Sequence, residues 1–251
     1  MKLKVLTYNI RSGHPADRED KAYYYDLSKV TEEIRFFSPD FFGLNEVDNH
    51  QKRTNFDNQT AIIAKSLEFP HFYFSKATDL GSSSSEYGNA VVSKFPIVFV
   101  ETILPPEPPR DDELYYEQRG IAHVVLELPN GRQITLLQTH FGLNVGERQN
   151  MLTVLLRMID EIKTPLILMG DFNMRPYDWL LNPVRERLTE VTEALGMMPK
   201  TYPSYDRGHP DCKIDYIFVS RHFQPICAEV KQTQASDHYP YYAELELLDN
   251  E

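Results

Sequence analysis

Hydrophobic residues that alternate with polar ones, together with short continuous hydrophobic runs, predict β-strands along most of the chain. Many of these runs are rich in β-branched and aromatic residues and are bounded by Gly, Pro or Asp, as strands commonly are. The predicted strands are Leu3–Ile10, Phe41–Asn45, Ala90–Ser93, Ile97–Thr102, Ile121–Leu128, Ile134–His140, Leu166–Met169, Ile214–Val219 and Tyr241–Leu247.

Three segments between these strands have hydrophobic residues at helical spacing, and we predict helices over Asp26–Phe37, Gln59–Leu67 and Glu147–Ile162. Strands and helices follow one another in mixed order. We find no internal repeat and no change of composition that would mark a domain boundary. The pattern therefore predicts one domain over residues 1–251, a sandwich of two β-sheets packed face to face with helices outside.

The composition agrees with a chain that folds around its own core. Of 251 residues, 41% are hydrophobic, with 14 Phe and 15 Tyr, so neither a disulfide nor a structural metal is needed for folding. The two cysteines, Cys212 and Cys227, form no metal-ligand spacing and are expected to be free thiols in a reducing compartment.

The hydrophobic part of Met1–Ile10 is too short for a signal-peptide core, and no apolar run has the roughly 20 residues that span a membrane. We therefore expect a cytoplasmic monomer with no transmembrane segment.

The formal net charge is −11. Tight binding to nucleic acid normally requires a basic surface, because each phosphate contact needs a cation. The charge therefore disfavours a nucleic-acid partner. It does not exclude one, since carboxylates gathered around a metal ion contribute to the same total.

Polar side chains of particular types occur where the predicted strands end. Each has an ordinary explanation when taken alone: a helix cap, a solvated strand end, a tight turn or a hydrogen-bonded histidine. Asp215 differs, because it lies inside an apolar strand, and a buried carboxylate needs a partner. Together these residues are the types that phosphate ester hydrolysis requires, namely ligands for a hard divalent cation and groups that orient water and move protons. The residues at or near strand ends are Asn9, Glu46, His140, Asp171, Asn173, Asp237 and His238.

These residues lie in segments that resemble, in order along almost the whole chain, the motifs of the endonuclease/exonuclease/phosphatase superfamily. The family includes DNase I, abasic-site endonucleases and neutral sphingomyelinases. The resemblance implies an α+β fold, a four-layer αββα sandwich with two mixed sheets and a site at one rim. The matching segments are TYNIR (7–11), LNEVD (44–48), GNAVVSKFPI (88–97), QRGIAHV (118–124), LLQTHFG (136–142), LMGDFNMRP (168–176), KIDYIFVS (213–220) and ASDHYP (235–240).

The resemblance also implies roles for individual residues. Glu46 corresponds to the main ligand of a Mg²⁺ or Mn²⁺ ion, with Asn9 and Asp237 completing the metal site. The remaining residues correspond to catalytic and substrate-binding positions. Those are Asp171, which orients or deprotonates the attacking water; Asn173, which holds the water or a phosphate oxygen; His238, which contacts the phosphate; and Asp215, which orients His238.

Four further residues follow from the same resemblance. His140 is a candidate general acid, as in the DNase I and sphingomyelinase branches, and Glu86 is a candidate partner for it. Arg119 resembles the phosphate-binding arginine of its motif, and Asn89 is expected to bind substrate. One departure concerns the first motif, where Arg11 follows in place of the histidine that is common in the family.

We therefore expect a metal-dependent phosphoric ester hydrolase that acts on a small or lipid-derived phosphate ester. A DNA or RNA nuclease is the alternative. A catalytically silent binding protein of the same fold is the third interpretation, although it would not need the full set of polar residues. Four aromatic residues near the motifs form either a stacking platform for a base or sugar, or ordinary packing: Trp179, Tyr202, Tyr205 and Tyr239.

Overall fold

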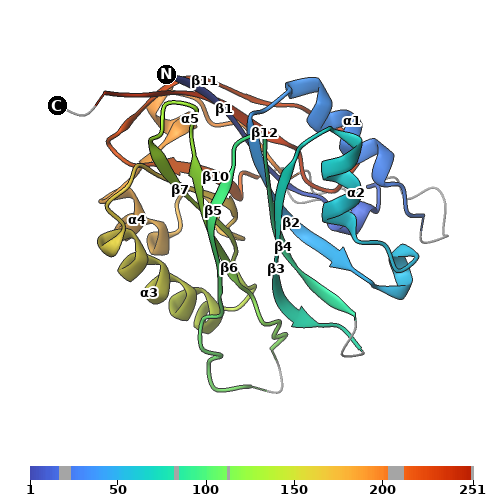
Figure 1. Ribbon diagram of the computed structural model, residues 1–251. Helices are drawn as coiled ribbons and strands as arrows, with labels where there is room; N and C mark the ends of the chain where they lie inside the picture. Colours follow the sequence, from blue (N-terminus) through green and yellow to red (C-terminus); the bar gives the residue numbers. More distant parts are fainter. Residues whose placement is uncertain (17–23, 82–84, 112–113, 203–211, 250–251) are drawn as a thin grey trace.

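The computed structural model describes residues 1–16, 24–81, 85–111, 114–202 and 212–249, and in it two six-stranded sheets pack face to face (Figure 1). The first sheet has the order β11-β12-β1-β2-β4-β3. Its strands are β1 (Lys2–Asn9), β2 (Phe41–Asn49), β3 (His71–Asp79), β4 (Glu86–Ser93), β11 (Phe223–Val230) and β12 (Tyr241–Leu247). In this sheet β1 and β2 are parallel, and the other pairs are antiparallel.

The second sheet has the order β5-β6-β7-β8-β10-β9. Within it β7 and β8 are parallel, whereas the remaining neighbours are antiparallel. Its strands are β5 (Ile97–Ile103), β6 (Ile121–Glu127), β7 (Gln133–His140), β8 (Leu166–Asp171), β9 (Thr189–Glu190) and β10 (Asp215–Val219).

Helices cover the outer faces of both sheets (Figure 1). The first sheet carries α1 (Leu27–Phe37) and α2 (Gln59–Ser66), and the second carries α3 (Val145–Glu161). The predicted αββα sandwich of two mixed sheets is thereby confirmed. The shorter helices are α4 (Asn182–Arg185) and α5 (Val191–Ala194), with 3-10 turns η1 (Arg11–Gly13), η2 (Lys52–Thr54) and η3 (Trp179–Leu181). In the part of the chain that the structure describes, no helix has the length and hydrophobicity to cross a membrane.

Strand β1 shows how the sequence produces the layers. Leu3 and Val5 point into the cluster between the two sheets, whereas Leu6 and Tyr8 belong to the cluster beneath α1 and α2. Hydrophobic residues therefore occupy both faces of this strand, as expected for a central strand that is covered on both sides. Each such side chain, fully buried, contributes about 1.5–3 kcal/mol.

Three strands were not predicted, and all of them lie at sheet edges. β3 and β11 flank the first sheet, and the two-residue β9 flanks the second. Edge strands are partly exposed and carry more polar residues than central strands, so their hydrophobic pattern is weak. β11 also contains a register shift between Pro225 and Cys227.

Two positions differ from the sequence prediction in ways that matter for the site. Glu46 does not end its strand, because β2 continues to Asn49 and shifts register against β4 between Leu44 and Val47. Glu46 therefore lies in a β-bulge, with φ of +56°. Asp215 is the first residue of β10 rather than an interior one.

Candidate active site

The strand ends at one rim of the sandwich bring the predicted polar residues together. Asn9, His140 and Asp171 are the last residues of β1, β7 and β8. His140 pairs with Asp171 in the parallel ladder, and Asp215 pairs with Asp171 in the antiparallel one. Sheet register therefore places three of these side chains next to one another without any loop.

His238 reaches the same rim from the segment that precedes β12. Ser236 anchors this segment, because its Oγ donates to the backbone oxygen of Asn9 at 2.8 Å. The backbone N–H of His238 in turn donates to Ser236 Oγ at 3.3 Å. The short polar run before the last strand is thus tied to the end of β1.

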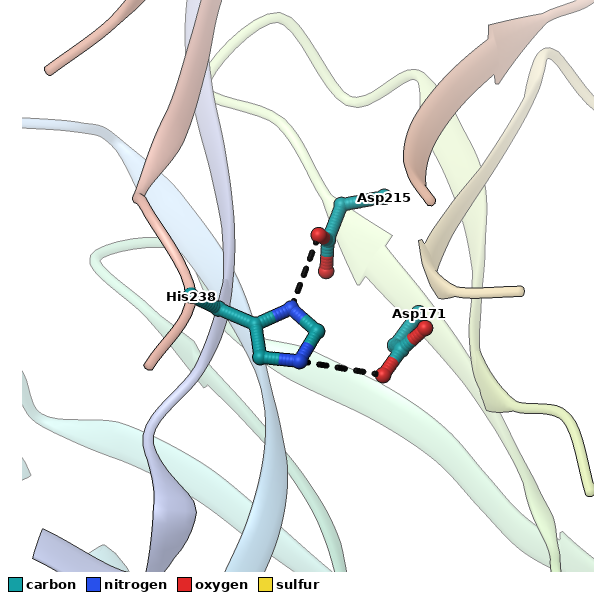
Figure 2. A group of neighbouring side chains, drawn as sticks. All are labelled: Asp171, Asp215 and His238. Atoms are coloured by element: carbon teal, nitrogen blue, oxygen red, sulfur yellow. Dashed lines mark hydrogen bonds and ion pairs between the residues drawn. The ribbon is translucent and has the colours of Figure 1, made fainter. Parts of the chain in front are cut away.

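His238 lies between two carboxylates (Figure 2). Its Nδ1 is 2.9 Å from Asp215 Oδ2, and its Nε2 is 3.6 Å from Asp171 Oδ2. Burial lowers the pKa of His238, but the negative charges of Asp215 and Asp171 outweigh it and hold the pKa well above its ordinary value. We infer that His238 is an imidazolium that donates through Nδ1 to Asp215. The expected pairing of Asp215 with His238 is present.

Asp171 Oδ2 is the atom on which the other side chains converge. It lies 3.1 Å from Asn9 Nδ2, 3.4 Å from His140 Nε2 and 3.6 Å from His238 Nε2. Asp171 Oδ1 accepts the backbone N–H of Asn173 at 2.8 Å. Burial raises the pKa of Asp171, but the charge of His238 and the hydrogen bonds from His140 and from the backbone of Asn173 bring the pKa below its ordinary value. Asp171 is therefore held as a carboxylate.

The ligand atoms of Asp171, Asp215 and His238 lie within 4.8 Å of one another, a spacing that a metal ion could bridge. Both ring nitrogens of His238 already face carboxylates, and Nδ1 makes a short hydrogen bond to Asp215. We therefore interpret this group as a hydrogen-bonded chain rather than as a metal cage.

The contact with Arg119 determines the tautomer of His140. The guanidinium can only donate, and its Nη1 lies 3.0 Å from His140 Nδ1, so that nitrogen accepts. The proton of a neutral His140 is then on Nε2, which faces Asp171. Asn173 Nδ2 lies 3.3 Å from the same Nε2 but donates instead to the backbone oxygen of Phe141 at 2.9 Å. His140 thus presents an N–H toward the centre of the site.

The suggested pairing of Glu86 with His140 is wrong. Glu86 accepts from Asn49 Nδ2 at 2.6 Å and pairs with Lys76 Nζ at 3.5 Å. β4 begins at Glu86, and its register with β2 and β3 directs this residue toward those strands. The partner of His140 is Arg119, which arrives from the segment before β6.

The residues expected to hold a metal ion are Asn9, Glu46 and Asp237. Asn9 Nδ2 donates to Glu46 Oε1 at 3.0 Å, while Asn9 Oδ1 accepts the backbone N–H of Arg11 at 3.1 Å. In this orientation the Asn9 amide positions the Glu46 carboxylate. Asp237 lies near Arg11, with Oδ2 3.6 Å from Nε.

The donor set fits a hard divalent cation. Among the described residues, the half-buried Glu46 carboxylate accepts a hydrogen bond from Asn9 and makes no direct ion pair, while the charge of Arg119 acts on it from farther away. Glu46 and Asp237 offer carboxylate oxygens, the atoms that Mg²⁺ and Mn²⁺ prefer. A half-buried carboxylate without a direct ion pair is stabilised when a cation binds to it.

Beneath the site, buried amides join the two sheets. Asn45 is fully buried, and its Oδ1 accepts the backbone N–H of Asp171 at 3.0 Å. Its Nδ2 donates to Asn89 Oδ1 at 2.8 Å, and Asn89 Nδ2 donates to the backbone oxygen of Gly120 at 2.8 Å. Asn89 is only 1% exposed, and both its amide oxygen and its amide nitrogen are hydrogen-bonded within the protein. Sequence reasoning overlooked Asn45, although a lone amide in an apolar strand signals a buried partner in the same way as Asp215.

The aromatic residues near the site have different surroundings. The Tyr202 ring lies 4.8 Å from the His238 ring, and Tyr239 is buried. Trp179 is 64% exposed, and Tyr177, which was not singled out from the sequence, is 91% exposed. Tyr205 lies outside the described residues. The segment that follows Asp171 therefore presents two exposed rings.

Comparison with known protein families matches residues 6–238 to the Endonuclease/Exonuclease/phosphatase family. Among curated proteins, the chain is 26% identical to the uncharacterized protein YbhP of Escherichia coli, over 97% of this chain and 96% of that protein. The match thus includes nearly all of both chains.

Solved structures with the same architecture include bacterial and human proteins. An endonuclease/exonuclease/phosphatase from Bacteroides vulgatus has a TM-score of 0.78 at 22% identity, with 98% of this chain and 99% of that one covered. A mannosyl-6-phosphatase from Bacteroides thetaiotaomicron has a TM-score of 0.73 at 17% identity, covering 97% and 99%. The human Nocturnin catalytic domain with bound sulfate has a TM-score of 0.71 at 20% identity, covering 98% and 93%. At these identities the likeness establishes the fold.

Proposed function

Because the chain belongs to the endonuclease/exonuclease/phosphatase family, whose members hydrolyse phosphate esters, we propose that it is a divalent-metal-dependent phosphoesterase. The observation that carries this proposal is the convergence on Asp171 Oδ2. Asn9, His140 and His238 place nitrogen atoms within 3.1–3.6 Å of that one buried oxygen. A site built only for folding would not need an ionised carboxylate between two histidines at a sheet rim.

The proposed reaction is in-line attack of water on phosphorus. Asp171 orients the water and accepts its proton, and its carboxylate is available because the surrounding positive charges keep it ionised. The imidazolium of His238 and the Asn173 amide face the equatorial phosphate oxygens, where charge accumulates in the transition state. Asp215 acts through His238 by fixing its ring.

His140 donates a hydrogen bond from Nε2 to the leaving oxygen in this mechanism. Arg119 occupies Nδ1, so the ring proton lies on Nε2 and stays there. The proton that the leaving oxygen takes up is the one that Asp171 accepts from water, and Asp171 Oδ2 lies 3.4 Å from the same Nε2. The arginine thus sets this hydrogen-bond donor and also adds positive charge near the phosphate.

Glu46 and Asp237 would hold a Mg²⁺ or Mn²⁺ ion, with Asn9 orienting Glu46. When bound, such an ion neutralises charge on the phosphate and polarises it toward attack.

We propose a small or lipid-derived phosphate ester as the substrate. The net charge of −11 supports a substrate smaller or less charged than a nucleic acid. The exposed Tyr177 and Trp179, in the segment that follows Asp171, suit an apolar leaving group. They also suit stacking of unpaired bases, which keeps a single-strand nuclease as the second candidate.

The test is a panel of initial rates with Mg²⁺ or Mn²⁺ and with EDTA. The panel contains bis-p-nitrophenyl phosphate, p-nitrophenyl phosphate, supercoiled plasmid, single-stranded RNA and sphingomyelin or a lysophospholipid. We expect EDTA-sensitive cleavage that Asp171→Ala abolishes, with the small or lipid esters preferred. Preference for RNA or plasmid would select the nuclease. Absence of any cleavage by a folded, metal-binding chain would instead favour a silent binding protein.

A further inference from the structure

Two backbone segments beside the proposed metal ligands have left-handed conformations at residues other than glycine. Glu46, in the bulge of β2, has φ of +56°. Arg11 and Ser12, in η1 directly after Asn9, have φ of +48° and +52°. Each such residue is strained and persists only where neighbouring contacts hold it. Contacts that keep Glu46 and η1 in place are therefore part of the site.

Ser12 links the two strained segments. Its Oγ lies 3.1 Å from the backbone oxygen of Glu46 and 3.0 Å from Asp48 Oδ1, and donates its single proton to one of them at a time. The backbone oxygen of Ser12 accepts from Gln59 Nε2 at 2.7 Å, and Gln59 Oε1 accepts the backbone N–H of Asp48 at 2.8 Å. Ser12, Asp48 and Gln59 are all buried.

A charged pair lies at the centre of these contacts. The buried carboxylate of Asp48 receives two hydrogen bonds from Arg53, from Nε to Oδ2 and from Nη2 to Oδ1, each at 2.7 Å. Arg53 Nη2 also donates to Ser12 Oγ at 3.1 Å, and Thr54 Oγ1 donates to Asp48 Oδ2 at 3.2 Å. A bidentate pair whose carboxylate is buried and has both oxygens satisfied fixes geometry, even where its net stabilisation is small.

We propose that Asp48 and Arg53 are positioning residues that set the affinity of the site for its divalent cation, by holding Glu46 in its left-handed conformation through Ser12. The proposal rests on the proposed function. Without the pair, Ser12 Oγ loses its contacts with Asp48 and Arg53 and keeps the Glu46 backbone oxygen alone, and the bulge can relax toward ordinary strand geometry. Because side chains of successive strand residues point to opposite faces, that relaxation turns the Glu46 carboxylate away from Asn9.

The test is titration of the full chain with Mn²⁺ alone, with free Mn²⁺ followed by electron paramagnetic resonance. Arg53→Met should raise the Mn²⁺ Kd about tenfold or more, which is the usual effect of losing a group that orients a metal ligand. Arg53→Lys should raise the Kd less, because it keeps the charge but not the two-pronged contact. With Mn²⁺ at saturation, kcat should return to within about threefold of the wild-type value, since the reacting groups are intact.

The matched control is Arg187→Met. Arg187 makes a similar two-bond contact with Asp160, at 2.8 and 3.3 Å, beside Leu166 at the opposite end of β8 from Asp171. This variant should lose a similar contact between an arginine and a carboxylate, and it should keep the wild-type Mn²⁺ Kd. Circular dichroism melts establish that each variant is folded.

Ser12→Ala is the second variant and leaves the pair of Asp48 and Arg53 in place. It should raise the Mn²⁺ Kd severalfold, and it decides the question if Arg53→Met does not fold. Wild-type Kd values in folded Arg53→Met or Ser12→Ala, or an equal rise in Arg187→Met, would overturn the positioning role alone. Failure of the wild type itself to bind Mn²⁺ and to hydrolyse any ester would overturn the proposed function, and this proposal with it.

Discussion

The two halves of the site meet at Asn9 and are built in different ways. In the half that holds His140, Asp171 and Asp215, the residues are neighbours in regular strand ladders. In the half that holds Glu46, the backbone leaves regular geometry at a bulge and again at Ser12. The first half follows from sheet register, whereas the second depends on a polar network that keeps strained backbone in place.

This difference suggests how each half tolerates change. Register is shared over many residues, so a substitution at a strand end changes chemistry without moving the backbone. A bulge with a left-handed glutamate is a local arrangement, and the loss of one contact can release it. We expect variants of the first half to alter rates with small structural effects, and variants of the second to alter metal affinity and local order.

The largest effect is expected from Asp171→Asn. The change keeps the size of the side chain and removes the proton acceptor, so kcat should fall about 10³-fold or more. The Mn²⁺ Kd should change by less than about threefold, because Glu46 and its network are untouched. The comparison fails if metal affinity falls in parallel with kcat.

A smaller loss, about 10²-fold, is expected for His140→Gln with an alkyl phosphate ester. The loss should be much smaller with p-nitrophenyl esters, because their leaving group departs without a proton. Rates measured on both ester types with the same variant check this. Equal losses on the two would show that His140 does not act on the leaving oxygen, and Arg119 would then serve the phosphate alone.

The free energy of unfolding should depend on pH through His238, which lies between Asp171 and Asp215 in the first half of the site. Its pKa in the folded protein is raised, so its stabilising contribution is complete below the unfolded pKa of about 6.5 and is lost as pH rises through the folded value. Asp215→Asn removes much of that shift. The difference in unfolding free energy between wild type and variant should therefore shrink from pH 6 toward pH 10. Urea denaturation at intervals across that range measures it, and a constant difference would mean that His238 is not charged in the fold.

The sequence was sufficient for the fold and for most of the site because both depend on local pattern and residue type. Central strands are hydrophobic on both faces, and Asp215 in an apolar segment already signalled a buried partner, found here in His238. The bulge at Glu46 was not predictable, since it depends on how β2 meets β4 and η1. The predicted partner of His140, Glu86, was also wrong, because the contact between His140 and Arg119 arises from tertiary packing and not from sequence spacing.

The smallest expected effect tests the strain in the second half. Glu46→Gly and Glu46→Ala both remove the carboxylate and should both abolish tight Mn²⁺ binding. They differ in backbone preference, since glycine adopts a positive φ freely, whereas alanine pays about 1 kcal/mol or more. Glu46→Gly should therefore be more stable than Glu46→Ala by about 1 kcal/mol in urea denaturation, reduced somewhat by the greater freedom of glycine in the unfolded chain. The same pair of substitutions at Val47, which follows the bulge and does not have a positive φ, should favour alanine instead. If alanine is preferred at both positions, the backbone at Glu46 is not strained, and the hydrogen bonds around Asp48 are not needed to hold its conformation.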